Sequence, residues 1–399
     1  MTRVSLPRFS AAELASLADP YPVYARLRAA SALSRGGPAQ WFVTRYAEVA
    51  ACLRDPRLGA ELPEGFRNFS VGDGPAQTFL AKVLGRRDPP DHTRLRALMT
   101  RTFTPHQVRA LESRIGVLVD ELLDRCTVPG EFDVVREIAF PLPLKVICDL
   151  IGIPRADEHL IRDKADALAR AFAGVLSEAD RSVADQAVGW MRGYIGGMLD
   201  ERTAAASGDV LSRLLADADD PAGPTTRDEI VDNVIFLFFA GFETTMNLIS
   251  SACALLSTRP AEFARLRADR GRIPAAVEEF LRFDAPFQTT LRFTREPVEI
   301  DGHRISRGRV VVLLLGSANH DERQFADPAR LDLARDPNPH VSFGGGVHHC
   351  FGAALARAQA RIVLDRLLDR CVRLSPAGEP LRRAEFRSYT KVPLLGEAS

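Results

Sequence analysis

The segment FGGGVHHCFGAALAR, residues 343–357, places one cysteine, Cys350, between flexible backbone and a helical Ala/Leu/Arg pattern. A thiolate near a helix N-terminus is stabilised by free N–H groups and by the helix dipole. Glycines allow the backbone to turn sharply and to approach a flat ligand, and three stand here: Gly344, Gly346 and Gly352. The adjacent His348 and His349 point in different directions, so they do not complete a zinc site with the cysteine. The pattern favours a cofactor that takes one thiolate ligand, such as haem iron, over a hydrolase, which needs a positioned base and acid.

A second cluster, AGFETT at residues 240–245, interrupts an otherwise apolar stretch. An acid followed by an alcohol, Glu243 and Thr244, is costly inside an apolar helix unless the pair is hydrogen-bonded or reached by water. Ala240 and Gly241 remove side-chain bulk beside the pair, which leaves room for a small molecule against the backbone. The alternative is a local kink with an accidental glutamate, because a threonine hydroxyl can also bond back to a helix carbonyl.

Two pairs of charged or polar residues have helical spacing. Glu279 and Arg282 are three residues apart in EEFLR and can form a charge-assisted pair on one helix face. His92 and Arg96 are four residues apart in DHTRLR and also share a face. Pairs of this kind are common on solvated helix surfaces, so spacing alone does not distinguish a buried anchor from a surface pair.

Together these motifs resemble the cytochrome P450 family. The cysteine segment matches the haem-binding signature F-G-x-G-x-H-x-C-x-G at Phe343, Gly344, Gly346, His348, Cys350 and Gly352. AGFETT resembles the oxygen-binding groove A-G-x-[DE]-T-T of the family, EEFLR its E-x-x-R element and DHTRLR its H-x-x-x-R propionate site. ANHDE at residues 318–322 is close to the family's A-N-R-D, with His320 in place of arginine. The matches keep the order of the family and cover essentially the whole chain.

The resemblance implies a role for each matched residue. Cys350 is expected to be the axial ligand of the iron of haem b (iron protoporphyrin IX). Glu243 and Thr244 are expected to be catalytic, supplying protons and holding dioxygen. The remaining haem contacts are expected from the signature residues and from His92, Arg96, Ala240, Gly241, Arg292 and His348, of which His92, Arg96, Arg292 and His348 would hold the propionates.

Further residues are assigned by the same matching. Glu279, Arg282 and a third residue, Arg330 in DPARLD, are expected to stabilise the fold around the haem without catalysing anything. The substrate pocket is expected to include a Gly- and Pro-rich loop at residues 62–81 and, besides Ala240, these side chains: Phe236, Phe239, Phe287, Gln288, Thr290 and Val392.

Such a pocket is apolar and partly aromatic, with few polar handles. Arginine greatly outnumbers lysine and alanine is abundant, which indicates a GC-rich bacterial genome. We therefore expect insertion of one oxygen atom, by hydroxylation or epoxidation, into a bacterial polyketide, peptide or aromatic compound, free or carrier-bound. A terpenoid or a fatty acid stays open.

The expected source of electrons is a separate protein, because the sequence carries no flavin or nicotinamide fingerprint. NAD(P)H would supply them through a ferredoxin reductase and a ferredoxin. Arginines near the cysteine side would form the landing surface for an acidic partner, although a plain solvated face explains them nearly as well: Arg94, Arg101, Arg357 and Arg361. Two other hypotheses do without the pair Glu243–Thr244: a peroxide-driven haem-thiolate enzyme and a non-catalytic haem-binding protein.

The composition is that of a globular protein with a large core. The chain has 399 residues, 46% of them hydrophobic, and a formal net charge of zero, which gives no reason to expect nucleic acid or an anionic membrane as a partner. No apolar signal segment opens the sequence, and the most apolar stretch, residues 234–242, is too short to span a bilayer. We expect a cytoplasmic monomer. Five of the six cysteines lie in helix-like apolar surroundings and are expected in the core: Cys52, Cys126, Cys148, Cys253 and Cys371.

Apolar residues at three- and four-residue spacing predict a mainly α protein with a small β portion. Helices are predicted at residues 21–30, 108–126, 157–175, 184–202 and 260–268, and strands at residues 41–44, 297–305 and 309–316. The longest helix is predicted from about residue 226 to about residue 257, opened by a capping box between Thr226 and Glu229. A helix of this length crosses a domain, which favours a single domain over residues 1–399. The resemblance implies that this domain has the cytochrome P450 fold, with the long central helix over the haem.

Overall fold

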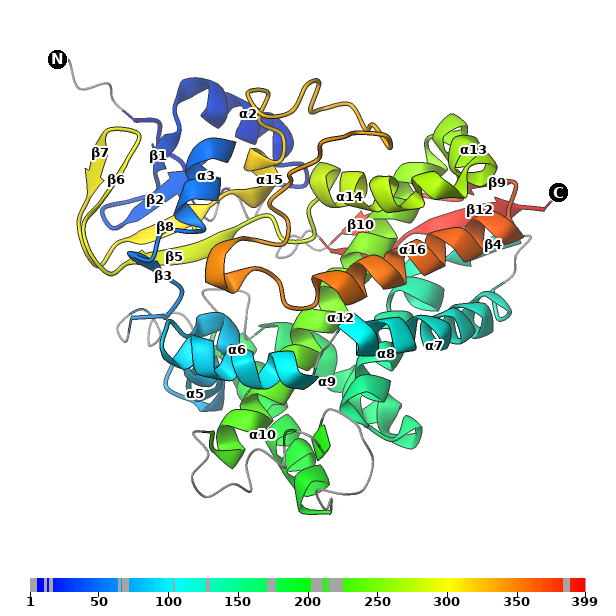
Figure 1. Cartoon of the computed structure of the whole chain (residues 1–399), viewed down its shortest axis with the longest axis horizontal. Coiled ribbons are helices and arrows are strands. Elements are labelled where there is room, and N and C mark those ends of the chain that lie inside the picture. Colours follow the sequence, from blue (N-terminus) through cyan, green and yellow to red (C-terminus); the bar gives the residue numbers. More distant parts are fainter. Residues whose placement is uncertain are drawn as a thin grey trace. The chain divides into compact units, whose positions relative to one another are not determined.

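The computed structural model in Figure 1 is mainly helical, with small sheets, which confirms the predicted class. It describes residues 6–10, 13, 17–63, 66, 72–102, 105–126, 130–170, 177–201, 211–212, 214, 225–382 and 388–398. The chain divides into two compact units. The first consists of Met1–Gly59, Ile115–Phe140 and Thr244–Ser399, and the second of Ala60–Arg114 and Pro141–Glu243. A single domain over the whole chain stays a prediction.

The first unit holds a five-stranded sheet in the order β1-β2-β8-β5-β3. Its strands are β1 (Leu33–Arg35), β2 (Gln40–Val43), β8 (Val310–Leu313), β5 (Thr290–Thr294) and β3 (Leu58–Gly59). Only β2 and β8 pair in parallel, with Phe42 opposite Val312. Because side chains alternate along a strand, one face packs Phe42 and Val312 against α2 (Tyr21–Ala30), and the other packs Trp41 and Val311 against α3 (Tyr46–Cys52).

The remaining strands of this unit form smaller sheets. β6 (Val298–Ile300) and β7 (His303–Ile305) make the predicted hairpin, whose turn residues Asp301 and Gly302 both have positive φ, 47° and 72°. β4 (Gly130–Asp133), β12 (Pro393–Glu397) and β9 (Arg373–Pro376) form a three-stranded sheet in that order. β10 (Leu381–Arg382) pairs with β11 (Tyr389–Lys391).

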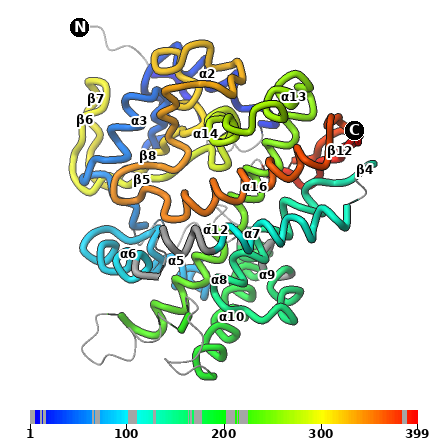
Figure 2. The backbone as a smooth tube through the Cα atoms, turned by 45° about the vertical axis from the view of Figure 1, so that its right-hand side comes forward, coloured from blue at the N-terminus to red at the C-terminus, as the bar shows by residue number. Residues whose placement is uncertain are grey.

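The helices of the first unit are α13 (Pro260–Ala268), α14 (Ile273–Phe283), α15 (Leu315–Ala318) and α16 (Ala353–Arg370). Short turns of helix precede or link them: η2 (Val135–Ala139), η4 (Arg270–Arg272) and η5 (Gly346–His348). Figures 1 and 2 both show α14 beside α16, and these two helices are in contact. α16 follows the cysteine segment directly, as its Ala/Leu/Arg pattern predicts.

The second unit is built from α5 (Pro75–Lys82), η1 (Leu84–Arg86), α6 (Asp91–Thr102), α8 (Pro141–Ile151), η3 (Arg155–Asp157), α9 (Glu158–Arg170) and α10 (Glu178–Asp200). α10 begins six residues before its predicted start, because Ser177 caps it by accepting a hydrogen bond from the Asp180 N–H at 3.1 Å. Residues 171–175 and 202, also predicted helical, lie outside the described residues.

The predicted loop at residues 62–81 is wrong in its second half. Residues 75–82 form α5, with Pro75 in the first turn, where a missing N–H costs nothing. Asp185 of α10 accepts the N–H of Ala76 at 2.7 Å and so satisfies this helix start from a distant part of the sequence. Within the same loop, residues 64–65 and 67–71 lie outside the described residues.

α7 (Pro105–Leu123) and α12 (Arg227–Ser257) each contribute residues to both units. The capping box of α12 is confirmed: the Thr226 N–H donates to Glu229 Oε2 at 2.9 Å, and the Glu229 N–H donates to Thr226 Oγ1 at 3.2 Å. Among the described residues, α12 alone is long and apolar enough to cross a membrane, but 78% of its most apolar window is buried. It is therefore a core helix.

Candidate functional site

The cysteine loop, residues 343–352, is a tight turn that ends just before α16. The Cys350 N–H donates to the carbonyl of Phe343 at 2.8 Å, which closes the loop. Gly344 and Gly346 have φ of 68° and 63°, in the left-handed region that favours glycine. A Cβ on Gly346 would lie 2.5 Å from the backbone oxygen of Leu53, so no other residue fits there. The shape of the loop is thus fixed by its backbone geometry, and Cys350 is exposed.

Cys350 differs from the other cysteines in exposure. The remaining five are buried as predicted, and burial raises the pKa of Cys52, Cys126, Cys148 and Cys253 to about 12 and that of Cys371 to about 11. A thiol with so high a pKa stays protonated at neutral pH and is neither a nucleophile nor a metal ligand. Cys350 is therefore the cysteine available for ligation.

An aromatic and ionic chain anchors the loop to α14. The Arg357 guanidinium lies 4.4 Å from the centre of the Phe343 ring. Arg357 also donates to both carboxylate oxygens of Glu278, each at 2.7 Å, and His340 Nε2 lies 3.1 Å from the same carboxylate. Burial opposes ionisation of Glu278, but these hydrogen bonds outweigh it and lower its pKa to about 2. The Phe343 end of the loop is therefore fixed to a charged, rigid support.

The middle of α12 has a single accessible face. Between Ile230 and Cys253 every residue is buried except four that share one side of the helix: Phe236, Ala240, Gly241 and Thr244. Glu243, one residue before Thr244, is only 1% exposed. The helix continues unbroken through this region. This segment thus presents a narrow strip of small and aromatic residues that ends in a hydroxyl beside a buried acid, without the local kink that the threonine could have caused. The catalytic role of Glu243 and Thr244 stays a prediction.

The residues predicted to hold the propionates are placed as follows. Arg292 is 4% exposed, and its Nη1 donates to Thr290 Oγ1 at 3.2 Å and to the carbonyl of Leu291 at 2.9 Å. His92 is buried, and it shares one face of α6 with the half-buried Arg96. His348 is half-buried at the end of η5. Within the first unit, Arg292 and His348, with the exposed Cys350 and its glycine-shaped loop, fit a haem with anionic tails. Within the second unit, His92 and Arg96 are polar groups of the kind that a propionate needs.

The E-x-x-R pair is a buried anchor. Arg282 and Glu279 are both 0% exposed, and Arg282 donates to the two carboxylate oxygens at 2.7 and 2.8 Å. Glu279 also accepts the N–H of Asp332 at 2.9 Å and Asn338 Nδ2 at 3.1 Å. The five donors to this carboxylate are completed by Arg335, whose Nε lies 3.2 Å from Oε2.

The assignment of Arg330 as the third member is wrong. Its side chain is 69% exposed and pairs with Asp332 at 3.3 Å, and only its backbone carbonyl accepts from Arg282, at 3.4 Å. Arg335, 10% exposed, occupies the place beside Glu279. The segment has no regular secondary structure, so sequence spacing does not show which arginine turns inward.

The predicted pocket residues fall into two groups. Phe287, Gln288 and Thr290 are half-buried, as is Phe236. Phe239 and Val392 are 3% and 2% exposed, so neither presents accessible surface to a pocket in this structure. Gln288 is turned back: its Nε2 donates to the carbonyl of Ala285 at 2.8 Å and to the Tyr21 hydroxyl at 3.2 Å.

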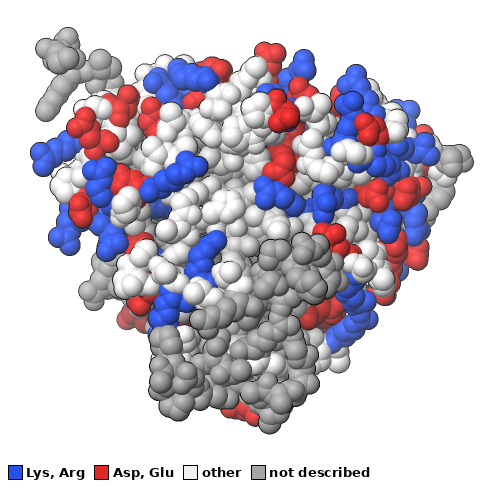
Figure 3. All heavy atoms as spheres, in the orientation of Figure 1, with Lys and Arg blue, Asp and Glu red and all other residues white. Residues whose placement is uncertain are grey.

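Two of the four arginines expected to bind an acidic redox partner are already engaged in ion pairs. Arg94 donates to Glu229 at 2.6 Å, and Arg357 is paired with Glu278. Figure 3 shows basic and acidic side chains intermixed on the face of the molecule that it draws. The Arg101 side chain lies outside the described part of the chain. The landing surface stays a prediction.

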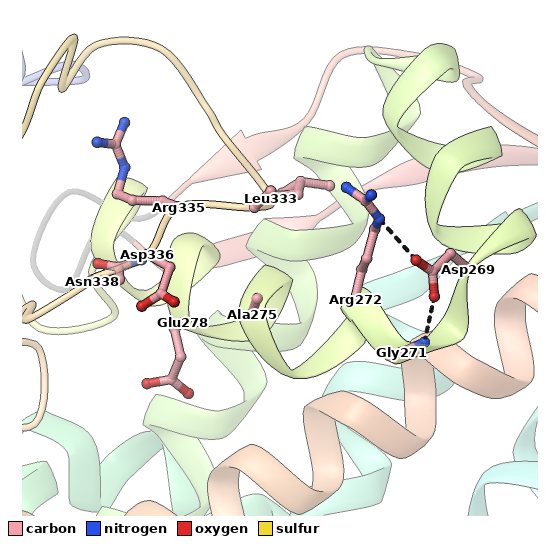
Figure 4. A pocket seen from close by; sticks show the side chains of 10 residues that line it. Asp269, Gly271, Arg272, Ala275, Glu278, Leu333, Arg335, Asp336 and Asn338 are labelled. Carbon is pink, nitrogen blue, oxygen red and sulfur yellow. Dashed lines mark hydrogen bonds and ion pairs between the residues drawn. The ribbon is translucent and has the colours of Figure 1, made fainter.

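A surface cleft of about 740 Å³ lies beside the E-x-x-R anchor, between the start of α14 and residues 333–338 (Figure 4). Glu278 and Asp336 lie at one end, and Asp269 and Arg272 at the other. Asp269 pairs with Arg272 at 3.0 Å and accepts the Gly271 N–H at 3.1 Å. The cleft contains neither Cys350 nor any predicted pocket residue. Of its other charges, Glu278 pairs with Arg357 and Arg335 with Glu279, so the cleft belongs to the surroundings of the anchor.

Comparison with known proteins identifies the family. Residues 198–392 match the model of the family "Cytochrome P450". The chain is 40% identical over 357 residues to vitamin D(3) 25-hydroxylase of Pseudonocardia autotrophica, covering 88% of this chain and 85% of the relative. It is 35% identical over 377 residues to 6-deoxyerythronolide B hydroxylase of Saccharopolyspora erythraea, covering 90% of each. The chain belongs to the cytochrome P450 family.

The fold agrees with solved structures of this family. The crystal structure of P450BioI in complex with acyl carrier protein ligated to hexadec-9Z-enoic acid matches with a TM-score of 0.89 and 33% identity, covering 95% of this chain and 99% of that one. The chain is a cytochrome P450 monooxygenase. Enzymes of this family use haem and O₂, with electrons delivered by redox partners.

Proposed function

We propose that this cytochrome P450 oxidises a bacterial secondary metabolite, a polyketide, peptide or aromatic compound, by hydroxylation or epoxidation. The accessible strip of α12 carries the proposal: Phe236, Ala240 and Gly241 offer an apolar wall, and Thr244 adds one hydroxyl at its end. Two relatives are named for the hydroxylation of vitamin D(3) and of 6-deoxyerythronolide B, which supports hydroxylation. P450BioI with a loaded acyl carrier protein supports a carrier-bound substrate as an alternative to a free one.

The haem is proposed to lie on the cysteine loop. Cys350 would supply the thiolate ligand of the iron, and Gly344, Gly346 and Gly352 would let the backbone of the loop approach the porphyrin, while Arg357 holds Phe343. The cationic or hydrogen-bonding partners of the propionates are His92, Arg96, Arg292 and His348. When bound, the haem supplies the site at which O₂ is reduced and one oxygen atom is transferred.

Glu243 and Thr244 are proposed to manage protons. Thr244 presents its hydroxyl on the accessible face of α12, where Oγ1 can donate one hydrogen bond and accept another from a water molecule. Glu243 is buried beside it, so its carboxyl group can pass a proton to that water only by moving or through a chain of hydrogen bonds. Ala240 would leave the space in which this water and the substrate meet, whereas Gly241 packs near Ile147, whose Cδ1 would lie 3.3 Å from a Cβ at this position.

The electrons are proposed to come from NAD(P)H through a ferredoxin reductase and a ferredoxin. The enzyme is proposed to act as a monomer in the cytoplasm. A peroxide-driven or non-catalytic haem protein would not require a hydroxyl beside a buried acid on the accessible face of the central helix, so the pair Glu243–Thr244 favours the O₂-dependent reaction.

A substrate screen tests the proposal. Vitamin D(3), 6-deoxyerythronolide B, and hexadec-9Z-enoic acid, free and on acyl carrier protein, are titrated while the haem absorption band is followed as water leaves the iron. Binders are then incubated with O₂, NADPH, ferredoxin and reductase, and in parallel with hydrogen peroxide alone. Product only with the complete redox chain supports the proposal. Equal turnover with peroxide alone contradicts it.

Two sets of variants test the haem site. Cys350→Ser is expected to abolish the thiolate spectrum of the ferrous carbon-monoxide complex, because serine is not ionised at neutral pH, while Cys371→Ala keeps it. Arg292→Leu and Arg96→Leu are expected to speed haem loss to a scavenger, since each removes a cationic propionate partner. Arg57→Leu, an exposed arginine paired with Asp55, is the matched control. Haem loss at the control's rate in both variants refutes the propionate assignment.

A further inference from the structure

Asp284, directly after α14, is a buried acid that joins three distant segments of the first unit. It is 7% exposed. Its Oδ2 accepts hydrogen bonds from Ser251 Oγ and Arg382 Nη2, both at 2.7 Å, and its Oδ1 accepts one from the Tyr21 hydroxyl at 3.3 Å. These donors belong to α12, β10 and α2. The sequence motifs of the haem site give no role to any of the four residues.

The Arg382 side of this cluster fixes the hairpin of β10 and β11. The Arg382 guanidinium lies 3.8 Å from the centre of the Tyr389 ring and also contacts the Tyr389 hydroxyl. The residue before Tyr389, Ser388, accepts a hydrogen bond from Asn247 of α12 at 3.2 Å. Two bonds from α12, one through Asp284 and one direct, therefore hold this hairpin. Val392 follows it immediately.

The Tyr21 side fixes the loop at residues 285–290. The Tyr21 hydroxyl donates its proton to Asp284, and its oxygen accepts a hydrogen bond from Gln288 Nε2 at 3.2 Å. Gln288 Oε1 is buried against Gly316, where a Cβ would come within 2.1 Å of it, and the Gly316 N–H donates to the Gln288 carbonyl at 3.1 Å. The side chain of Gln288 is thus confined to one orientation.

The hydrogen bonds around Asp284 run in one consistent direction. Gln288 donates to Tyr21 and Tyr21 to Asp284, while Ser251 and Arg382 donate to the same carboxylate. Only an ionised carboxylate accepts all three of its donors. Replacing it by an amide turns one acceptor into a donor and leaves the Arg382 charge, 22% exposed, without its counter-ion.

We propose that Asp284 is a positioning residue for the substrate pocket: it holds the 285–290 loop and the β10–β11 hairpin in one arrangement relative to α12. The inference rests on the proposed function, because Phe287, Gln288 and Thr290 are pocket residues only if that function is right. Asp284 itself need not touch the substrate. It determines where the residues around the substrate stand.

The test compares Asp284→Asn with two other variants of the haem-loaded enzyme. Tyr21→Phe removes only the hydroxyl and keeps the ring beside His320, 4.3 Å away. Asp321→Asn is the matched control: this acid is 1% exposed, accepts the Tyr46 N–H at 2.8 Å and pairs with Arg323, and neither Tyr46 nor Arg323 is a predicted pocket residue. Affinities for imidazole and 4-phenylimidazole are measured from the haem spectrum, since both ligate the iron but only the second reaches the pocket walls. Amide hydrogen exchange is followed in parallel.

Asp284→Asn is expected to lower the ratio of 4-phenylimidazole to imidazole affinity about fivefold or more and to speed exchange about tenfold in residues 285–290 and 388–392. Tyr21→Phe should act in the same direction, with faster exchange in residues 285–290 only. Asp321→Asn should change neither. An unchanged ratio in Asp284→Asn, with a fall in melting temperature equal to that of Asp321→Asn, overturns the proposal. If Asp284→Asn does not retain haem, the proposal is judged by the affinity ratio and the exchange rates of Tyr21→Phe. A wild-type protein that binds neither azole refutes the proposed function, and with it the pocket to be positioned.

Discussion

Replacing Arg335 by glutamine is expected to destabilise the enzyme by about 2–3 kcal/mol, whereas the same change at Arg330 should cost less than about 1 kcal/mol. Arg335 is 10% exposed, and its Nε and Nη1 donate to Glu279 Oε2 at 3.2 Å and to the Ala326 carbonyl at 2.9 Å. Hydrogen bonds to charged groups contribute about 1.5–3 kcal/mol, and Glu279 keeps its other donors, so the loss is not that of a fully abandoned charge. Arg330 is 69% exposed and its partner Asp332 34%, where ion pairs contribute little.

The measurement is urea unfolding of the haem-loaded proteins, followed by far-UV circular dichroism and by the haem band. Wild type, Arg335→Gln and Arg330→Gln are compared at one pH and ionic strength. Glutamine keeps most of the side chain, so the difference reports the lost charge and not a lost volume. Equal losses in the two variants, or a larger loss at Arg330, would show that the inward placement of Arg335 is wrong.

Three more predictions follow from other parts of the structure. Gly189→Ala and Gly193→Ala should each raise the free energy of unfolding by about 0.4–1 kcal/mol, because both glycines are helical and a Cβ at either meets nothing within 4 Å. Gly346→Ala should lower the free energy of unfolding, and urea unfolding of all three variants checks both statements. Thr244→Ala should leave haem binding intact but lower product per NADPH and raise peroxide, and Glu243→Gln should slow turnover; full coupling in Thr244→Ala would refute the proton role. Since the folded pKa of Glu278 is about 2, below its ordinary value, Glu278→Gln should destabilise by about 1–2 kcal/mol at pH 7, and the difference from wild type should shrink as the pH falls from about 4.5 towards 2. A difference that stays constant over that range would contradict it.

Local signals in the sequence located the regular elements well. The capping box placed the start of α12 within one residue, because its two hydrogen bonds depend only on residues 226 and 229. The tight turn of the cysteine loop was equally predictable, because glycine is the residue that adopts a positive φ, as Gly344 and Gly346 do. The burial of Glu279 and Arg282 also agrees with the anchor that their spacing allowed.

Features that depend on tertiary contacts could not be predicted from the sequence. The glycine and proline content of residues 62–81 predicts a loop, whereas the start of α5 is satisfied by Asp185, about a hundred residues later in the chain. Arg335 and Arg330 have similar sequence surroundings, and only the fold shows which one turns towards Glu279. No local pattern predicts the role of Asp284, because the donors described above lie at residues 21, 251 and 382, far apart in the sequence.

Because one cysteine is exposed and five are buried, thiol labelling can measure the fraction of the protein that contains haem. A maleimide at neutral pH should modify the haem-free chain once, at Cys350, because the other thiols are buried and keep their protons. Haem ligation removes that single reactive sulfur. The labelled fraction of a preparation, read by mass spectrometry, therefore gives its haem-free fraction without any engineered cysteine.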